Sequence, residues 1–113
     1  MKVVLAGGSG ALGRRLAAAA SARGDEVVVL TRTPRPGIAY RQVRWDGQSV
    51  GAWADELADA VLINLAGELV DRRPSASNIA LLTRSRVQPT AALVAASRSA
   101  TPVLWVQLST LAI

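Results

Sequence analysis

Apolar residues along the chain change their spacing several times, and each change marks an expected element. Lys2–Ala6 and Glu26–Thr31 are short apolar runs rich in β-branched residues, a pattern typical of strands buried on both faces. From Ala11 to Arg23, leucine and alanine recur at helical spacing while arginines take the other side, and Gly24 supplies a stop. Strand, glycine loop, helix and strand together predict a βαβ unit.

The alternation continues beyond this unit. Tyr40–Trp45 predicts a short third strand and Val50–Leu57 a short helix. Asp59–Leu65 is strongly apolar and predicts a fourth strand. Asn78–Ser99 predicts a second long helix, which Pro89 should kink or split because proline removes a backbone donor.

Val103–Leu108 is the last apolar run and predicts a fifth strand. Alternating strands and helices with continuous apolar strands predict an α/β fold, namely a doubly wound, Rossmann-like parallel sheet in the order 3-2-1-4-5 with helices on both faces. The sequence stops at Thr110–Ile113 with no closing helix. We therefore expect residues 1–113 to be one domain, the amino-terminal part of a longer protein truncated after the fifth strand.

Composition excludes several kinds of chemistry. The 113 residues include no Cys and no His, which removes disulfides, thiol nucleophiles, histidine bases and the usual zinc sites, and no metal site is expected. The net charge is +5, but the arginines are spread along the chain and aromatic residues make up only 4%. No apolar stretch approaches a bilayer span or a signal-peptide core. We expect a cytoplasmic protein with no nucleic-acid and no membrane partner.

Gly7, Gly10 and Gly13 are spaced G-x-x-G-x-x-G between an expected strand and an expected helix. Such glycines let the loop turn tightly, let the backbone approach a pyrophosphate and let the helix pack on the strand, and the helix N-terminus offers N–H groups to the phosphates. Glycine loops also serve as plain turns. The strands on both sides and the helix that opens at Ala11 favour a nucleotide-binding loop.

The end of the second expected strand indicates the dinucleotide. An acidic residue there would hold the ribose 2′-hydroxyl of NAD, but this sequence has Leu30, Thr31 and Arg32. Arg32, with Arg14 and Arg35, can instead pair with a 2′-phosphate in the geometry that guanidinium favours. This favours NADP over NAD; the alternative is that Arg32 is a solvated arginine at a strand end.

Two further loops follow the third and fourth expected strands, at the edge where an open parallel sheet binds its ligand. Asp46 can accept a hydrogen bond from an adenine amino group, although Asp46-Gly47 is also a common turn dipeptide. Ala66 and Gly67 can let a cofactor lie close to the backbone.

Five motifs taken together resemble a known family. Ala6–Arg14, Leu30–Arg32, Ile63–Glu68, Ser85–Val87 and Gln107–Thr110 resemble the extended short-chain dehydrogenases, in particular the sugar-nucleotide epimerase-like proteins of the NAD-dependent epimerase/dehydratase family. The resemblance covers the whole chain. It implies that the three glycines hold the pyrophosphate, that positions 46 and 47 border the adenine and that positions 65 to 67 line the cofactor.

The resemblance also implies that Thr110 matches the active-site Ser/Thr, whose hydroxyl bonds the reacting carbonyl or alcohol, which makes it the expected catalytic residue. The expected cofactor-binding residues, from the residues themselves or from the resemblance, are Gly7, Ser9, Gly10, Ala11, Leu12, Gly13, Arg14, Thr31, Arg32, Arg35, Asp46, Gly47, Leu65, Ala66 and Gly67.

The chain departs from the family at its catalytic pair. The only Tyr is Tyr40 and the only Lys is Lys2, so the Tyr-x-x-x-Lys motif is missing, and Arg86 stands where many members have Asn. In that mechanism tyrosinate is the base and lysine lowers its pKa. We expect the NADP-binding part of an epimerase or reductase whose full-length form acts on a small, nucleotide-sugar-like molecule, with the isolated chain inactive. The alternative is a non-catalytic nucleotide-sensing or interaction module.

The last expected strand also predicts self-association. Val103–Leu108 is interrupted only by the polar Gln107 and carries neither a charge nor a proline. An unprotected strand edge of this kind is a template for pairing with another chain.

Overall fold

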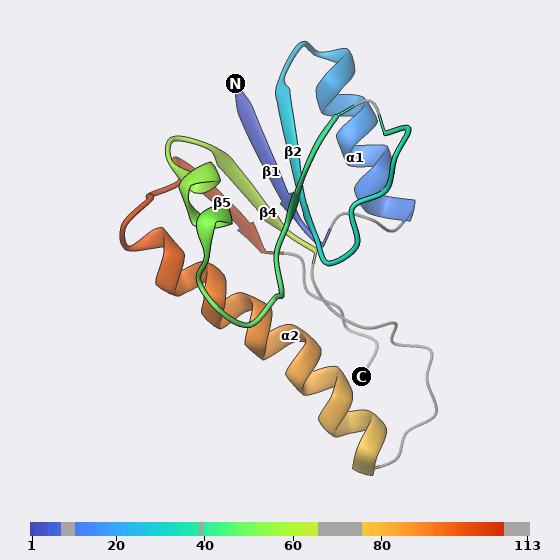
Figure 1. Cartoon of the computed structure of the whole chain (residues 1–113), viewed down its shortest axis with the longest axis vertical. Helices are drawn as coiled ribbons and strands as arrows, with labels where there is room; N and C mark the ends of the chain where they lie inside the picture. Colours follow the sequence, from blue (N-terminus) through green and yellow to red (C-terminus); the bar gives the residue numbers. More distant parts are fainter. Residues whose placement is uncertain (8–10, 39, 66–75, 108–113) are drawn as a thin grey trace.

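The structure is a computed structural model of the whole chain (Figure 1). It describes residues 1–7, 11–38, 40–65 and 76–107, and for residues 11 and 76–86 it describes the backbone alone. Of the expected site residues, Ser9, Gly10, Ala66, Gly67 and Thr110 lie outside the described residues.

Five parallel strands form one sheet (Figure 1). They are β1 (Lys2–Ala6), β2 (Glu26–Thr31), β3 (Arg41–Arg44), β4 (Val61–Asn64) and β5 (Leu104–Gln107). Their order across the sheet is β3-β2-β1-β4-β5, and every pairing between neighbours is parallel. The predicted sheet and its strand order are confirmed.

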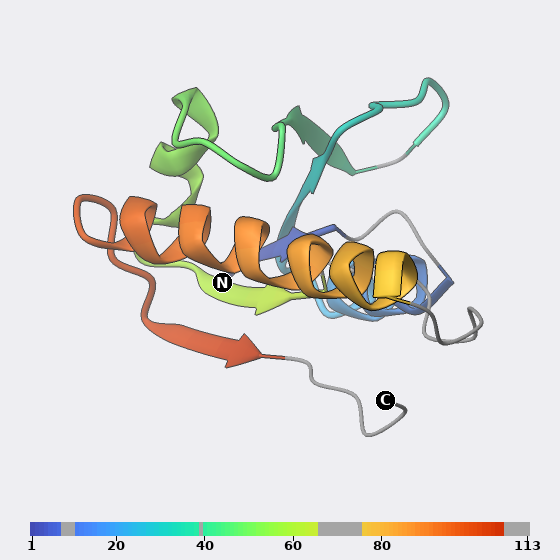
Figure 2. The same ribbon diagram turned by 90° about the horizontal axis from the view of Figure 1, so that it is seen from below.

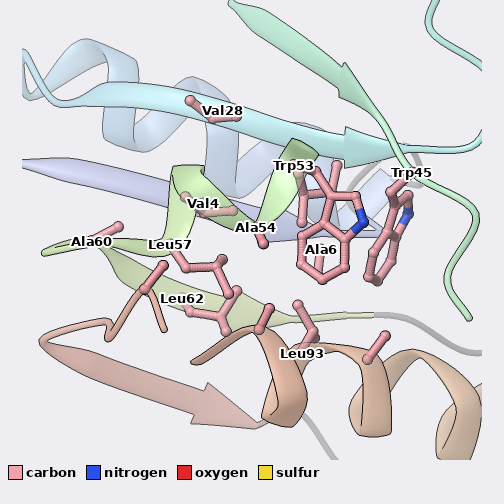
Figure 3. Packing of buried hydrophobic residues seen from close by; sticks show 14 residues of the cluster. Val4, Ala6, Val28, Trp45, Trp53, Ala54, Leu57, Ala60, Leu62 and Leu93 are labelled. Atoms are coloured by element: carbon pink, nitrogen blue, oxygen red, sulfur yellow. The ribbon is translucent and has the colours of Figure 1, made fainter. Parts of the chain in front are cut away.

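Helices connect the strands and cover the sheet on both faces. The described helices are α1 (Ala11–Ala22), the 3-10 helix η1 (Ala52–Leu57) and α2 (Ala76–Ser97). In a strand, successive side chains point to opposite faces, so each strand contributes to two cores. Val4 and Leu62 pack with Leu93 of α2 and with η1 in the larger core (Figure 3). Val3 packs with Ala17 of α1 in the second core.

The helix α2 differs from the expectation in its bounds and in its continuity. It begins at Ala76 and ends at Ser97, and it runs through Pro89 as one helix instead of splitting there. Pro89 is almost completely buried, so the packing of its ring offsets the backbone hydrogen bond that proline removes. Neither α2 nor any other helix in the described part of the chain has the length and apolar character needed to cross a membrane.

Candidate functional site

Three expected site residues, Gly7, Thr31 and Leu65, lie side by side at the carboxyl edge of the sheet. The Gly7 N–H donates to the carbonyl of Leu30 at 3.0 Å, and the Leu65 N–H donates to the carbonyl of Ala6 at 2.9 Å. These bonds extend the pairing of β1 with both neighbouring strands. The chain therefore leaves β1, β2 and β4 at one edge, where parallel sheets bind ligands.

The described part of the glycine motif consists of Gly7, directly after β1, and Gly13, in the first turn of α1. Gly7 has a φ of 75°, in the left-handed region that favours glycine. Gly13 is buried in the first turn of α1, whereas Leu12 and Arg14 beside it are exposed. A buried glycine leaves the helix free to pack closely against the strands. The backbone of Ala11 begins this helix.

The end of β2 is tied to the segment that follows β3. Thr31 is buried, and its hydroxyl accepts a hydrogen bond from the N–H of Thr33 at 3.2 Å. The Trp45 N–H donates to the carbonyl of Thr31 at 3.1 Å, one step beyond the last paired residues of the two strands. Arg32 therefore leaves the sheet directly beside the loop that begins at Asp46.

The Arg32 guanidinium lies against Gly47 in that loop. A Cβ atom on Gly47 would lie 3.0 Å from Nη2 and 3.4 Å from Nε of Arg32. Gly47 has a φ of 71° and is buried, whereas Arg32 is exposed. Among the described residues, Arg32 makes no ion pair and no side-chain hydrogen bond.

Asp46 holds the loop in place. Its Oδ1 accepts hydrogen bonds from the backbone N–H groups of Gln48 at 2.8 Å and Ser49 at 2.9 Å, and its Oδ2 accepts one from the Ser49 hydroxyl. The Ser49 hydroxyl, followed by the Ser49 and Gln48 N–H groups, lowers the pKa of Asp46 to about 2. The carboxylate is thus ionised at neutral pH and forms an Asx turn on the exposed surface of the protein.

A cavity of about 490 Å³ opens beside this loop, a size typical of ligand sites. Arg32, Arg44 and Asp46 contribute charged groups to its lining, and Trp45 and Trp53 contribute aromatic surface. The two indole rings pack edge to face, with centroids 5.3 Å apart, as the close view of the core shows (Figure 3).

Two cavities border the three arginines that were expected near the 2′-phosphate. Arg32 lines the large cavity, whereas Arg14 and Arg35 line a separate cavity of about 50 Å³. The Gln42 side chain holds the backbone of Arg35, accepting from its N–H at 3.0 Å and donating to its carbonyl at 2.6 Å.

Sequence reasoning missed a polar cluster at the end of β4. Asn64 is 1% exposed, and its Nδ2 donates to Oγ1 of Thr90 at 3.0 Å and to Oε1 of Gln107 at 3.1 Å. Trp105 donates to the same Gln107 oxygen at 3.0 Å. The signal in the sequence was a lone asparagine at the end of an apolar strand, a position where a buried amide needs partners.

A five-stranded parallel sheet in this order, with a left-handed glycine after its first strand, defines a Rossmann-like α/β protein. The sequence matches the model of the NAD dependent epimerase/dehydratase family over residues 3–113, and the chain belongs to this family. The expected family membership is confirmed.

Several solved structures are similar to the chain. Human epimerase family protein SDR39U1 (isoform 2), solved with NADPH, has 31% identity and a TM-score of 0.76 over 99% of this chain and 37% of its own. MoeE5, in complex with UDP-glucose and NAD, has 28% identity and a TM-score of 0.79 over 98% of this chain and 37% of its own.

UDP-N-acetylglucosamine 4-epimerase from Bacillus cereus shares the fold, with 23% identity and a TM-score of 0.73 over 97% of this chain and 38% of its own. The chain thus spans less than two fifths of the length of these structures. Among the curated proteins, none matches it.

Proposed function

We propose that residues 1–113 form the NADP(H)-binding part of an epimerase or reductase of the extended short-chain dehydrogenase type. The observation that carries this proposal is Arg32, an exposed guanidinium at the end of β2 that borders a ligand-sized cavity. A carboxylate at this place would select NAD, whereas a guanidinium attracts a 2′-phosphate. The NADPH in the structure of the human epimerase family protein supports this choice.

The residues present fit such a cofactor. The left-handed turn at Gly7 and the buried Gly13 suit the close approach of a pyrophosphate. We assign Asp46 and Gly47 to the border of the adenine and Leu65 to the lining of the cofactor. When bound, NADP supplies a nicotinamide that accepts or donates a hydride, while the residues of the chain bind and orient it.

For the full-length protein we propose a small substrate that resembles a nucleotide sugar. The UDP-glucose in the MoeE5 complex supports this substrate class. Thr110 would bind the reacting carbonyl or alcohol through its hydroxyl.

The described residues do not assemble the family's tyrosine and lysine pair. Tyr40 packs against the core under α1, and Lys2 bonds Glu56 of η1. We therefore propose that the isolated chain binds the dinucleotide without turning it over.

Calorimetric titration of the chain with NADPH and with NADH tests the cofactor assignment. A charge-assisted contact between arginine and phosphate contributes about 1.5–3 kcal/mol, so NADPH should bind about tenfold or more tightly than NADH. Arg32→Ala should remove most of this difference and leave NADH binding nearly unchanged. Arg98→Ala removes the same charge from an exposed position beyond the end of α2 and should preserve the difference. Equal affinities in the unmodified chain would contradict the proposal.

A further inference from the structure

We propose that Gly47 is a positioning residue that holds the Arg32 guanidinium at the cavity and thereby sets the preference for NADP(H) over NAD(H). This inference rests on the proposed function, because it explains how the arginine that selects the cofactor is held.

The contact between the two residues leaves little room for a Cβ at position 47. Gly47 is buried, and the Nη2, Nε and Cζ atoms of Arg32 lie 3.0, 3.4 and 3.6 Å from the place where a Cβ would stand. A spacing of 3.0 Å is tighter than an ordinary van der Waals contact, so a side chain at position 47 requires the guanidinium to move by a few tenths of an ångström. The φ of 71° independently favours glycine at this position.

Hydrogen bonds hold the loop that packs against the guanidinium, both before and after Gly47. Before it, the Trp45 N–H bonds the Thr31 carbonyl and so ties the loop to the strand that carries Arg32. After it, the Asp46 carboxylate bonds Ser49, and the Trp53 indole donates to the Ser49 carbonyl at 3.2 Å. An arginine side chain loses rotamer freedom when it binds a phosphate. An arginine that already packs against a fixed backbone loses less of this freedom on binding, so the entropic cost of binding is lower.

The contact turns the Nε and Nη2 edge of the guanidinium toward Gly47 and leaves Nη1 farther from the loop. Gly47 offers Arg32 packing without a side-chain acceptor, and in the described part of the chain no carboxylate pairs with Arg32. Asp46, the nearest acid along the loop, directs its hydrogen bonds into its own turn. Arg44 lines the same cavity and adds a second positive charge to it. The guanidinium therefore lies against the loop without an ion-pair partner among the described residues, and its Nη1 side, which lies farther from Gly47, can bind a phosphate.

Gly47→Ala, titrated with NADPH and NADH, tests the inference. We expect the ratio of NADPH affinity to NADH affinity to fall about threefold or more, because the displaced guanidinium has to be ordered again when the phosphate binds, whereas a change at the adenine affects both affinities alike and leaves the ratio unaltered. Gly24→Ala is the matched control, since Gly24 has a φ of 88° but no atom within 4 Å of an added Cβ. It introduces similar backbone strain and should keep the preference.

Gly47→Asn separates the effect of the added Cβ from the effect of backbone strain. Asparagine tolerates the left-handed region better than alanine does, yet it carries the same Cβ. It should lower the preference as Gly47→Ala does. Thermal unfolding of each variant verifies that the fold is retained.

Combining Gly47→Ala with Arg32→Ala separates the possible outcomes. If Gly47 acts through Arg32, the double variant has the same cofactor ratio as Arg32→Ala alone. If Arg32→Ala abolishes the preference but Gly47→Ala and Gly47→Asn retain it, the positioning role is overturned while the proposed function stands. If the unmodified chain shows no preference, the cofactor assignment itself fails.

Discussion

Asn64 donates a hydrogen bond from Nδ2 to Oε1 of Gln107 at 3.1 Å and so joins the carboxyl ends of β4 and β5. The same nitrogen donates to Thr90 of α2 at 3.0 Å, so one buried amide links two strands and the helix between them. A buried polar group that loses its partner costs about 1–3 kcal/mol. This cluster therefore fixes the strand that leads toward position 110, the expected catalytic residue.

Asn64→Leu should lower the free energy of unfolding by about 2 kcal/mol, because the hydrogen bonds from Asn64 to Thr90 and Gln107 are both lost and each contributes about 0.5–1.5 kcal/mol. Urea denaturation measures this change. Gln48→Leu is the control, since Gln48 is an exposed amide residue, and it should change stability by less than about 0.5 kcal/mol. Equal stability of Asn64→Leu and the unmodified chain would show that the amide contributes nothing.

Glu56 predicts a pH-dependent contribution to stability. It accepts hydrogen bonds from Lys2 at 2.8 Å and from Arg41 at 2.9 Å, which joins η1 to β1 and β3. Burial raises the pKa of Glu56, but the hydrogen bond from Lys2 and the charges of Lys2 and Arg41 outweigh burial and hold the pKa below 4.5. A lowered pKa in the folded state means that the stabilisation is complete above the unfolded value and is lost as the pH falls through the folded value.

Glu56→Gln should therefore lower the free energy of unfolding by about 1 kcal/mol at neutral pH, with a difference that shrinks steadily as the pH falls below about 4.5. Denaturation at a series of pH values gives the profile. Asp55→Asn, a change on the same helix at an exposed carboxylate with no ion pair in the described part of the chain, should show a smaller effect at neutral pH. A Glu56→Gln difference that is independent of pH would argue against the ion pairs as its source.

The residue bounds of the strands that are buried on both faces were predicted most accurately from the sequence. Both β1 and β2 have the predicted bounds, because burial on two faces demands a continuous apolar run that starts and stops with the strand. The bounds of β3 were less accurate. It begins at Arg41, since Tyr40 packs into the core without joining the ladder. The continuity of α2 depends on the burial of Pro89, which only tertiary packing determines.

The sequence predicted which site residues lie at the ends of the strands, but it did not predict the contacts between the loops. Parallel strands bring Gly7, Thr31 and Leu65 to one edge, and the strand order alone implies this. The contact of Arg32 with Gly47 requires two loops to meet, and no local pattern encodes the path of a side chain across a neighbouring loop. The assignment of Arg32 and Arg35 to different cavities likewise depends on how the chain turns after β2.

The isolated chain should bind NADPH without oxidising it. Proton transfer in this family uses a tyrosine beside a lysine, whereas here Tyr40 packs on the core under α1 and Lys2 bonds Glu56. The absorbance of NADPH, followed in the presence of UDP-glucose and its oxidised analogues, should decline no faster than in a sample without protein. Turnover above that background would refute this prediction and reveal a base outside the expected pair.

The outer strand presents an apolar surface that predicts pairing between copies of the chain. β5 lies at the edge of the sheet beyond β4 (Figure 2). Val103, Leu104 and Val106 are 60%, 55% and 40% exposed. One side of β5 bonds β4, and in the described part of the chain no strand pairs with the other side. A net charge of +5 opposes association only weakly, since repulsion between exposed charges is screened beyond about 8 Å at physiological salt.

We expect the chain to self-associate through β5 at tens of micromolar, and Val106→Lys should shift it toward monomer because a charged edge resists strand pairing. The side chain is already exposed, so the fold should tolerate lysine, and circular dichroism verifies this. Val94→Lys is the matched control, since Val94 is 43% exposed but lies on α2, and this variant should still associate. Sedimentation velocity distinguishes the species, and a monomeric unmodified chain would rule out β5 as a contact between copies.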